Sequence, residues 1–249
     1  MSGISLALSG GAARGAYHLG VLQRIDEMGI SVKAICGTSI GAVIGTSYAA
    51  GVKPQRQLEI FKSPEFRDIF SFNYFRKSIF KINYNTQIIN ELIPCESLEK
   101  LNMPMFVTAL DLISGQELYY SSGKIPKLCF GSCALVPLFP PVEHEGHLLA
   151  DGGFVNHMPF MPLLNYNYPI VGVNLHPINI SQKQHSMYDF IKRTVYLNTY
   201  SNSQNSQKNC DSVITNDKLR DYSLVSFKHL DEMFELGYID AKVLLKKYI

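Results

Sequence analysis

The chain has 249 residues, of which 46% are hydrophobic and 18% charged, and its formal net charge at pH 7 is only +2. This composition is typical of a globular enzyme with a large buried core and excludes a disordered chain. A nucleic-acid-binding protein usually carries a clear basic excess or stripe, which is absent here, so we expect no nucleic-acid partner.

The chain length and the absence of repeats or linkers predict a single α/β domain over residues 1–249. The cysteines favour core packing in a reducing compartment over a disulfide framework, because they are odd in number, scattered and mostly flanked by apolar residues. They are Cys36, Cys95, Cys129, Cys133 and Cys210. Cys129 and Cys133 lie four residues apart without a second pair nearby, so we expect neither a metal ion nor another cofactor.

The N-terminal segment lacks the features of a secretory signal peptide. Residues 4–8 are apolar, but they are few, lack a basic segment before them and lead directly into a glycine-rich loop. Residues 34–52 are uncharged, yet four glycines and four hydroxyl residues make them only mildly apolar, so a buried strand and helix explain them better than a membrane span. We expect a cytoplasmic protein. Peripheral contact with membranes, and secretion as an effector, stay open.

The first 36 residues predict a strand, a glycine-rich loop, a helix and a second strand. The apolar runs 4–9 and 32–36 are typical of buried strands. Between them, residues 10–15 form the loop, and a helix with Leu19, Leu22 and Ile25 on one face extends to Met28. This order predicts a parallel sheet with a right-handed crossover.

The second strand is followed by Gly37-Thr38-Ser39-Ile40-Gly41 and then by a helix of small residues that ends at Gly51. Gly-x-Ser-x-Gly between a strand and a helix is the pattern of a nucleophile elbow. The serine must lie at the tip of a tight turn, and its flanking glycines let the strand, the helix and a substrate approach closely. Ser39 is therefore a candidate nucleophile.

Residues 54–94 differ in composition and periodicity from the rest of the chain. Between residues 61 and 81, seven aromatic residues alternate irregularly with five basic ones, with neither helical nor strand periodicity. One interpretation is a packed helical excursion from the domain. The other is a lid, or a surface that contacts lipid, because aromatic and basic residues together suit a membrane interface.

The remaining chain continues the α/β pattern. Apolar runs predict strands at 104–110, 116–121, 147–150, 169–175 and 212–215. Helices are predicted at 125–135, at 186–200 and at 227–248. The polar segment 201–207 is expected to be an exposed loop.

Asp151 is a candidate partner for Ser39. It stands where the short strand 147–150 ends, in front of two glycines that leave its carboxylate approachable. In a parallel sheet the strand C-termini gather at one edge, where ligands bind, so Ser39 and Asp151 would meet there. The alternative is an ordinary Asp-Gly turn. None of the seven histidines is marked by its sequence context as a triad histidine, although sequence distance alone excludes none of them.

The loop at residues 10–15 has two interpretations. A dinucleotide-binding loop requires a different glycine spacing and an acidic residue at the end of the second strand, where this chain has Cys36 and Gly37. An oxyanion hole requires backbone N–H groups at a helix N-terminus, which this loop offers. The oxyanion hole fits better, because a serine nucleophile needs such a device.

Four blocks of the sequence resemble, in order, the motifs of the patatin-like phospholipase family: its glycine-rich oxyanion block, nucleophile elbow, the block before the base, and Asp-Gly-Gly block. They lie at residues 8–22, 37–41, 132–141 and 151–159. The resemblance extends from near residue 4 to the C-terminal helix. It implies a three-layer α/β/α fold with a mostly parallel central sheet.

The resemblance also implies a Ser39–Asp151 dyad without histidine, in which Ser39 attacks an ester and Asp151 moves the proton. The N–H groups of Gly10, Gly11 and Ala12 would hold the oxyanion. Ala12 departs from the family, which usually has a third glycine there, and is expected to donate its N–H if its φ is negative. Arg14 matches a basic position that would orient the loop or bind a lipid phosphate; packing and capping of the loop is the alternative.

The sequence therefore predicts a hydrolase of phospholipid or lysophospholipid acyl esters. An esterase, thioesterase or transacylase with soluble substrates would use the same dyad, and contact of residues 61–80 with a membrane would separate the two. A catalytically idle lipid-binding module is disfavoured by the intact Ser39, Asp151 and glycine loop. The sequence identifies no protein partner.

Overall fold

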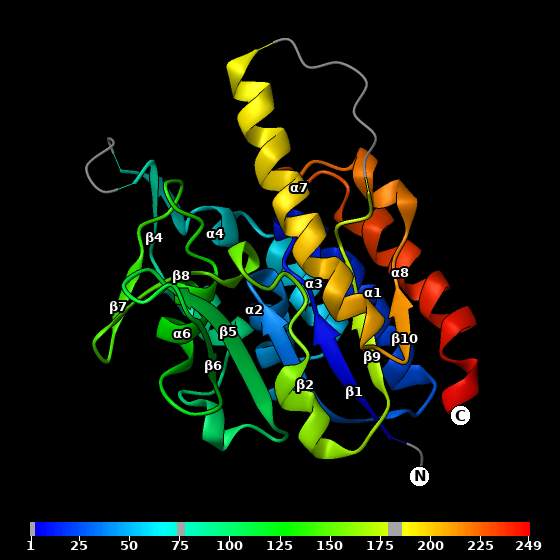
Figure 1. The fold of residues 1–249 in the computed structure, drawn as a ribbon. Coiled ribbons are helices and arrows are strands. Elements are labelled where there is room, and N and C mark those ends of the chain that lie inside the picture. Colours follow the sequence, from blue (N-terminus) through cyan, green and yellow to red (C-terminus); the bar gives the residue numbers. More distant parts are fainter. Residues whose placement is uncertain (1–2, 74–77, 179–185) are drawn as a thin grey trace.

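The computed structural model describes residues 3–73, 78–178 and 186–249 (Figure 1). Within these ranges, a central sheet has the strand order β10-β9-β1-β2-β5-β8-β7, and β6 pairs with β5 outside this path. The strands are β1 (Gly3–Leu8), β2 (Ser31–Thr38), β5 (Met105–Asp111), β6 (Glu117–Tyr120), β7 (Val142–His144), β8 (His147–Asp151), β9 (Ile170–Val173) and β10 (Ser212–Ile214).

Strands β10, β9, β1, β2 and β5 run parallel to one another, whereas β6 and β8 each pair antiparallel with β5, and β7 pairs antiparallel with β8. The sheet is thus mostly parallel, as predicted. The strand β1 lies at its centre and is buried along its whole length. The short strand β7 was not predicted from the sequence.

Helices cover both faces of the sheet (Figure 1). One face carries α1 (Gly15–Glu27), α2 (Ile40–Ala49), α3 (Pro54–Lys62), α6 (Ile125–Ser132) and α8 (Leu230–Leu244). The other face carries the 3₁₀ helix Met161–Tyr166 and α7 (Met187–Lys208). Along β1 the side chains alternate between these layers: Leu6 and Leu8 join the larger core, and Ala7 the smaller one. The predicted three-layer α/β/α architecture is confirmed.

The segment at residues 54–94 is only partly helical. After α3 come α4 (Pro64–Arg67), the two-stranded antiparallel sheet of β3 (Phe70–Phe72) and β4 (Phe80–Ile82), and α5 (Gln87–Leu92). Phe61 and Phe66 are buried, whereas Phe72 and Phe80 are exposed. Two of the seven aromatic residues in this segment, Tyr74 and Phe75, lie outside the described residues.

The prediction of an exposed loop at 201–207 is wrong, because α7 continues to Lys208. Ser203 and Ser206 are buried and Asn202 is half-buried, whereas Ser201 and Asn205 are exposed. Asn202 Nδ2 donates to the Phe154 carbonyl at 2.8 Å, and Ser206 Oγ bonds to Asn156 Oδ1 at 3.1 Å. These tertiary hydrogen bonds override the weak helix propensity of serine and asparagine.

No helix in the described ranges is both long enough and apolar enough to span a membrane. The uncharged run 34–52 instead forms the end of β2 and the buried helix α2.

Gly41 lets the first turn of α2 approach the end of β1. A Cβ atom at Gly41 would lie 2.4 Å from the carbonyl oxygen of Leu8 and 2.7 Å from that of Ser9. Gly45, one turn later, meets side chains rather than backbone: its Cβ would lie 3.1 Å from Met105 Cε and 2.9 Å from Ile35 Cγ2. Gly41 thus fixes the distance between the elbow and the glycine-rich loop that follows β1.

Gly41→Ala should lower the free energy of unfolding by about 1–3 kcal/mol or more, because rigid backbone must move. Gly45→Ala is the matched control on the same helix: it crowds side chains rather than backbone, and alanine favours the helix, so it should cost clearly less than Gly41→Ala. Urea unfolding of both variants measures the difference. Equal costs would contradict the account of Gly41.

Candidate active site

Ser39 lies at the tip of the turn between β2 and α2, where it has φ 54° and ψ −125°. A non-glycine residue in this region is strained and persists only where its surroundings enforce it. Two contacts do so. A Cβ at Gly37 would lie 2.5 Å from the Gly41 carbonyl oxygen, and the Ser39 N–H donates to Ser132 Oγ at 2.8 Å. The strained strand–turn–helix geometry that is typical of a nucleophile elbow is therefore present at Ser39.

The strand β5 brings Ser39 and Asp151 together. Its Thr108 pairs with Thr38 of β2, and the next residue, Ala109, pairs with Asp151 of β8. Because β6 pairs with both Thr108 and Ala109 along one side of β5, β2 and β8 share the other side and meet end to end. Asp151 thus reaches the C-terminal end of β2 from the opposite direction. The expectation that Asp151 ends a parallel strand is wrong, although the expected meeting occurs.

The carboxylate of Asp151 is buried, with 7% of the residue exposed. Its Oδ1 accepts the Gly153 N–H at 2.8 Å, so Asp151 caps the short 3₁₀ helix Gly152–Phe154. Burial raises the pKa of Asp151 to about 6, and the hydrogen bonds from Gly153 and the Ser39 hydroxyl only partly offset this effect. Asp151 is therefore a stronger base than an exposed aspartate.

The glycine-rich loop offers two free N–H groups, not three. The Gly10 N–H donates to the His157 carbonyl at 3.0 Å, so Gly10 does not match its predicted role as an oxyanion donor. In the described part of the chain, the Gly11 and Ala12 amides have no acceptor, whereas the Ala13 amide donates to the Leu224 carbonyl. Ala12 has φ 49°, so the condition of a negative φ is not met: the alanine adopts a conformation that usually favours glycine, and its N–H nevertheless has no acceptor among the described residues.

Arg14 lies behind the loop and does not line the cavity beside Ser39. Its guanidinium donates to the Tyr222 carbonyl from Nε at 3.1 Å and from Nη2 at 2.9 Å, and to the Leu175 carbonyl from Nη1 at 3.2 Å. The residue is 4% exposed. These contacts match the alternative of packing and loop capping, and they place Arg14 away from a bound substrate.

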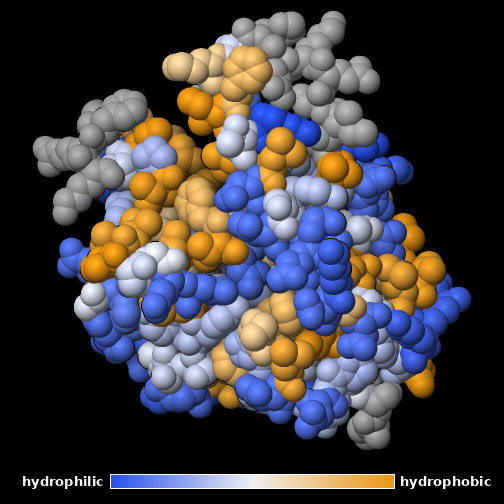
Figure 2. Space-filling model, in the orientation of Figure 1, coloured by the Kyte–Doolittle hydropathy of each residue, from blue (hydrophilic) through white to orange (hydrophobic). Residues whose placement is uncertain are grey.

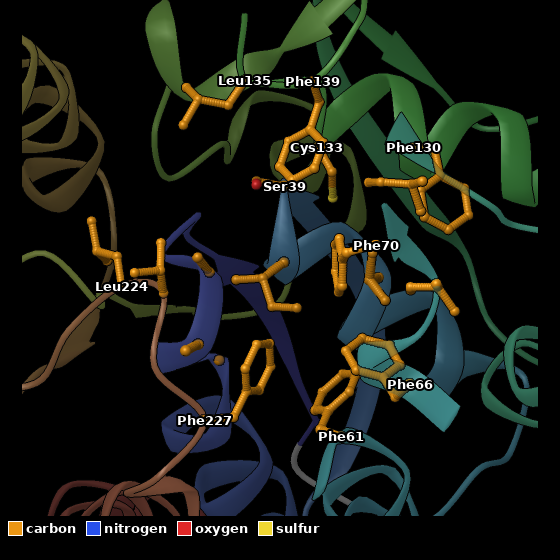
Figure 3. Close-up of a pocket in the computed structure, with 18 of the residues that line it drawn as sticks. Ser39, Phe61, Phe66, Phe70, Phe130, Cys133, Leu135, Phe139, Leu224 and Phe227 are labelled. Carbon is orange, nitrogen blue, oxygen red and sulfur yellow. The ribbon is translucent and has the colours of Figure 1, made fainter. Parts of the chain in front are cut away.

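Ser39 and Asp151 lie on the wall of an apolar cavity of about 360 Å³ (Figure 3). Figure 3 shows aromatic side chains around it, contributed by segments far apart in the sequence. They are Phe61, Phe66, Phe70, Phe80, Phe130, Phe139 and Phe227. No histidine in the described ranges lines this cavity, and His185 lies outside them. The residues of the cavity thus offer a hydroxyl, a carboxylate and backbone N–H groups beside a hydrophobic chamber.

Sequence reasoning missed two neighbours of Ser39. The Ser132 hydroxyl donates a hydrogen bond to the Thr108 carbonyl oxygen at 2.5 Å and accepts one from the Ser39 N–H, so it fixes the elbow to β5. Cys133 lines the cavity, and burial raises the pKa of its thiol, which keeps it protonated. Both belong to the block at 132–141 quoted from the sequence, which gave no role to either.

Comparisons with known proteins agree on one family. A family model described as patatin-like phospholipase matches residues 6–164. An uncharacterized NTE family protein of Mycobacterium tuberculosis is 30% identical over 171 residues, which cover 66% of this chain and 46% of that protein. The human patatin-like phospholipase domain-containing protein 6 is 32% identical over 164 residues, which cover 63% of this chain and 12% of that protein.

The fold is similar to that of VipD from Legionella pneumophila, with a TM-score of 0.64 at 15% sequence identity. That comparison covers 100% of this chain and 67% of the VipD chain. The match with the mycobacterial relative spans less than half of that protein's length, and the match with the human relative about an eighth.

The buried Asp151 should destabilise the protein when ionised. Its carboxyl is neutral in both states below pH 3.8, and between pH 3.8 and about 6 only the folded state keeps the proton. Stability therefore falls as the pH rises through this window, by up to about 3 kcal/mol, and the penalty stays constant above it. Asp151→Asn should be more stable than wild type at pH 8 and equally stable at pH 3.5, as measured by thermal unfolding. A constant difference at both pH values would contradict the account.

Proposed function

Because the chain belongs to the patatin-like phospholipase family, we propose that it is a lipid acyl hydrolase in which Ser39 is the nucleophile and Asp151 the general base. One observation carries the proposal: the Ser39 hydroxyl and the Asp151 carboxylate meet on the wall of an apolar cavity. The nucleophile, its base and a chamber for a hydrocarbon chain are thus combined at one place.

In the first step, the Ser39 oxygen attacks the ester carbonyl while Asp151 takes the hydroxyl proton. The carbonyl oxygen becomes negatively charged, and the Gly11 and Ala12 N–H groups donate hydrogen bonds to it. Asp151 then gives the proton to the leaving alcohol, which departs and leaves an acyl group on Ser39. In the second half, Asp151 takes a proton from a water molecule, and the water oxygen attacks the carbonyl of the acyl group. Asp151 then gives the proton to the Ser39 oxygen as the fatty acid leaves.

The environment of Asp151 suits this role. A base with a pKa of about 6 is ionised at neutral pH, yet binds a proton more strongly than an ordinary aspartate does. The hydrogen bond from the Gly153 N–H to Asp151 Oδ1 holds the carboxylate in place. A histidine is not needed in this scheme, because the carboxylate contacts the nucleophile directly.

The apolar lining of the cavity favours substrates with a long acyl chain over those with a short one. Its walls beyond Ser39 are almost entirely aliphatic and aromatic, and Phe61, Phe66 and Phe227 lie at the side away from the elbow (Figure 3). Each methylene group that leaves water for such a chamber contributes about 0.8 kcal/mol. This preference favours lipid substrates over soluble acyl substrates with small acyl groups.

We further propose that the protein binds lipid surfaces peripherally. Of the aromatic residues at 61–80, Phe72 and Phe80 are exposed, and Phe80 also lines the cavity. The exposed end of α7 adds Met187, Phe190 and Ile191, at the spacing of one helix face. Figure 2 shows hydrophobic residues both on this end of α7 and around β4. Exposed apolar residues on separate elements are typical of an interaction surface.

Ser39→Ala and Asp151→Asn should each reduce kcat for a long-chain phospholipid or lysophospholipid by at least about 10⁴-fold, because nucleophile and base act as a unit. In wild type, kcat should fall tenfold for each pH unit below about 6, as Asp151 becomes protonated. Product fatty acids are measured by mass spectrometry. Substantial activity in either variant, or activity that persists at pH 4, would refute the dyad.

Replacing Phe72, Phe190 and Ile191 together by serine should lower partitioning onto phosphatidylcholine–phosphatidylglycerol vesicles by at least about tenfold, since each buried apolar side chain contributes 1 kcal/mol or more. Hydrolysis of a soluble short-chain ester should not change. The control replaces three other exposed apolar residues near the C-terminus, Ile239, Val243 and Ile249, by serine. If both triple variants bind vesicles like wild type, the lipid-facing surface lies elsewhere.

A further inference from the structure

The loop between β1 and α1 is held by side chains that do not touch the cavity. Three consecutive peptide groups, between Ser9 and Ala12, each have a hydrogen bond to a fixed partner on at least one side. In a trans peptide the C=O and the N–H point in opposite directions, so fixing one determines the direction of the other. The partners of these peptides therefore decide where the free N–H groups point.

His18 fixes the first peptide. Its Nε2 lies 2.9 Å from the Ser9 carbonyl oxygen, and because a carbonyl only accepts, Nε2 must carry the proton. On the other side of the same peptide, the Gly10 N–H donates to the His157 carbonyl at 3.0 Å. The Ser9–Gly10 peptide is thus held from both directions, by α1 and by the segment that follows Asp151.

Ser9 fixes the second peptide. Its Oγ donates to the Gly10 carbonyl at 3.0 Å and accepts the Leu175 N–H at 2.9 Å, which ties it to the end of β9. With the Gly10 carbonyl held toward Ser9, the Gly11 N–H points the other way. The third peptide follows, since the Gly11 carbonyl accepts the Arg14 N–H at 3.1 Å and leaves the Ala12 N–H free.

The imidazole of His18 serves no other purpose that the described contacts show. The residue is completely buried, and its Nδ1 has no partner among the described residues. Burial lowers the pKa of His18 to about 4, so the ring is neutral at physiological pH and holds a single proton, on Nε2. A buried polar group with one contact is costly unless that contact matters to the structure around it.

We infer that Ser9 and His18 are positioning residues of the oxyanion hole: they fix the Ser9–Gly10 and Gly10–Gly11 peptides so that the Gly11 N–H group, beside that of Ala12, faces the carbonyl under attack. The inference rests on the proposed function for its catalytic consequence. The orientation of the loop itself is independent of that function. His157 joins this support through its backbone, which connects the loop to the turn that carries Asp151.

The kinetic test replaces His18 by leucine, which removes the N–H at similar volume. We expect kcat to fall by about 10- to 100-fold, with KM changed by less than about threefold, because misdirected donors weaken binding only in the transition state. His18→Gln should recover activity to within about fivefold of wild type, because its amide N–H reaches the place of Nε2–H. His144→Leu, the same change at another buried histidine far from the loop, is the control and should stay within about twofold.

A second measurement requires no substrate. Hydrogen exchange of the Gly10 amide should be about tenfold faster in His18→Leu than in wild type, and unchanged in His144→Leu, because the peptide loses one of its two anchors. If His18→Leu does not fold, His18→Gln and His18→Asn replace it: both are polar, but the shorter asparagine does not reach the Ser9 carbonyl. Asparagine should then show the loss, and glutamine should not.

The outcomes separate the inference from the proposed function. If wild type hydrolyses the substrate and the His18 variants change neither kcat nor the exchange of the Gly10 amide, the inference is overturned and the dyad is unaffected. Absence of hydrolysis by wild type would contradict the proposed function, and Gly10 exchange would still decide whether His18 holds the loop. Equal losses of kcat in His18→Leu and His144→Leu would show a general structural effect and also overturn it.

Discussion

The close approach of backbone to backbone around Ser39 is the constraint on which the site depends. Gly37 and Gly41 lie so near each other, and Gly41 so near the end of β1, that a Cβ at either would collide with a carbonyl group. This packing holds Ser39 at φ 54°, a conformation that costs about 1–3 kcal/mol. The same contacts place the elbow beside the glycine-rich loop, so one arrangement locates the proposed nucleophile and the Gly11 and Ala12 N–H groups, which have no acceptor among the described residues.

Burial gives the site its chemistry and also limits its stability. The apolar cavity removes water from Asp151, which raises its pKa to about 6 and makes the carboxylate a useful base near neutral pH. The same loss of solvation disfavours the ionised folded state. Hydrogen bonds from Gly153 and Ser39 offset part of this cost. The favourable packing of the rest of the fold must outweigh what is left of it. A site of this kind trades stability for reactivity.

Local sequence patterns predicted the elements around Ser39 well, because a strand, a tight turn and a helix of small residues are determined by neighbouring residues. Asp151 was found for a partly wrong reason: β8 is antiparallel, and its pairing with Ala109 depends on contacts between distant segments. Long-range hydrogen bonds also explain the two features that the sequence predicted wrongly, the role of Gly10 and the loop at 201–207. The Gly10 amide is taken by His157, and the polar half of α7 is helical because it bonds to the turn after Asp151. Such partners leave no periodic signal in the sequence.

The central claim is that Ser39 is a nucleophile activated by Asp151, and covalent trapping tests it most directly. A long-chain alkyl fluorophosphonate is incubated with wild type and with Asp151→Asn, and the modified residue and the rate of modification are determined by mass spectrometry. The account predicts a single phosphonylated residue, Ser39, and labelling at least about 100-fold slower in Asp151→Asn, because the base is lost. Labelling at another residue, or equal rates in the two proteins, would contradict it.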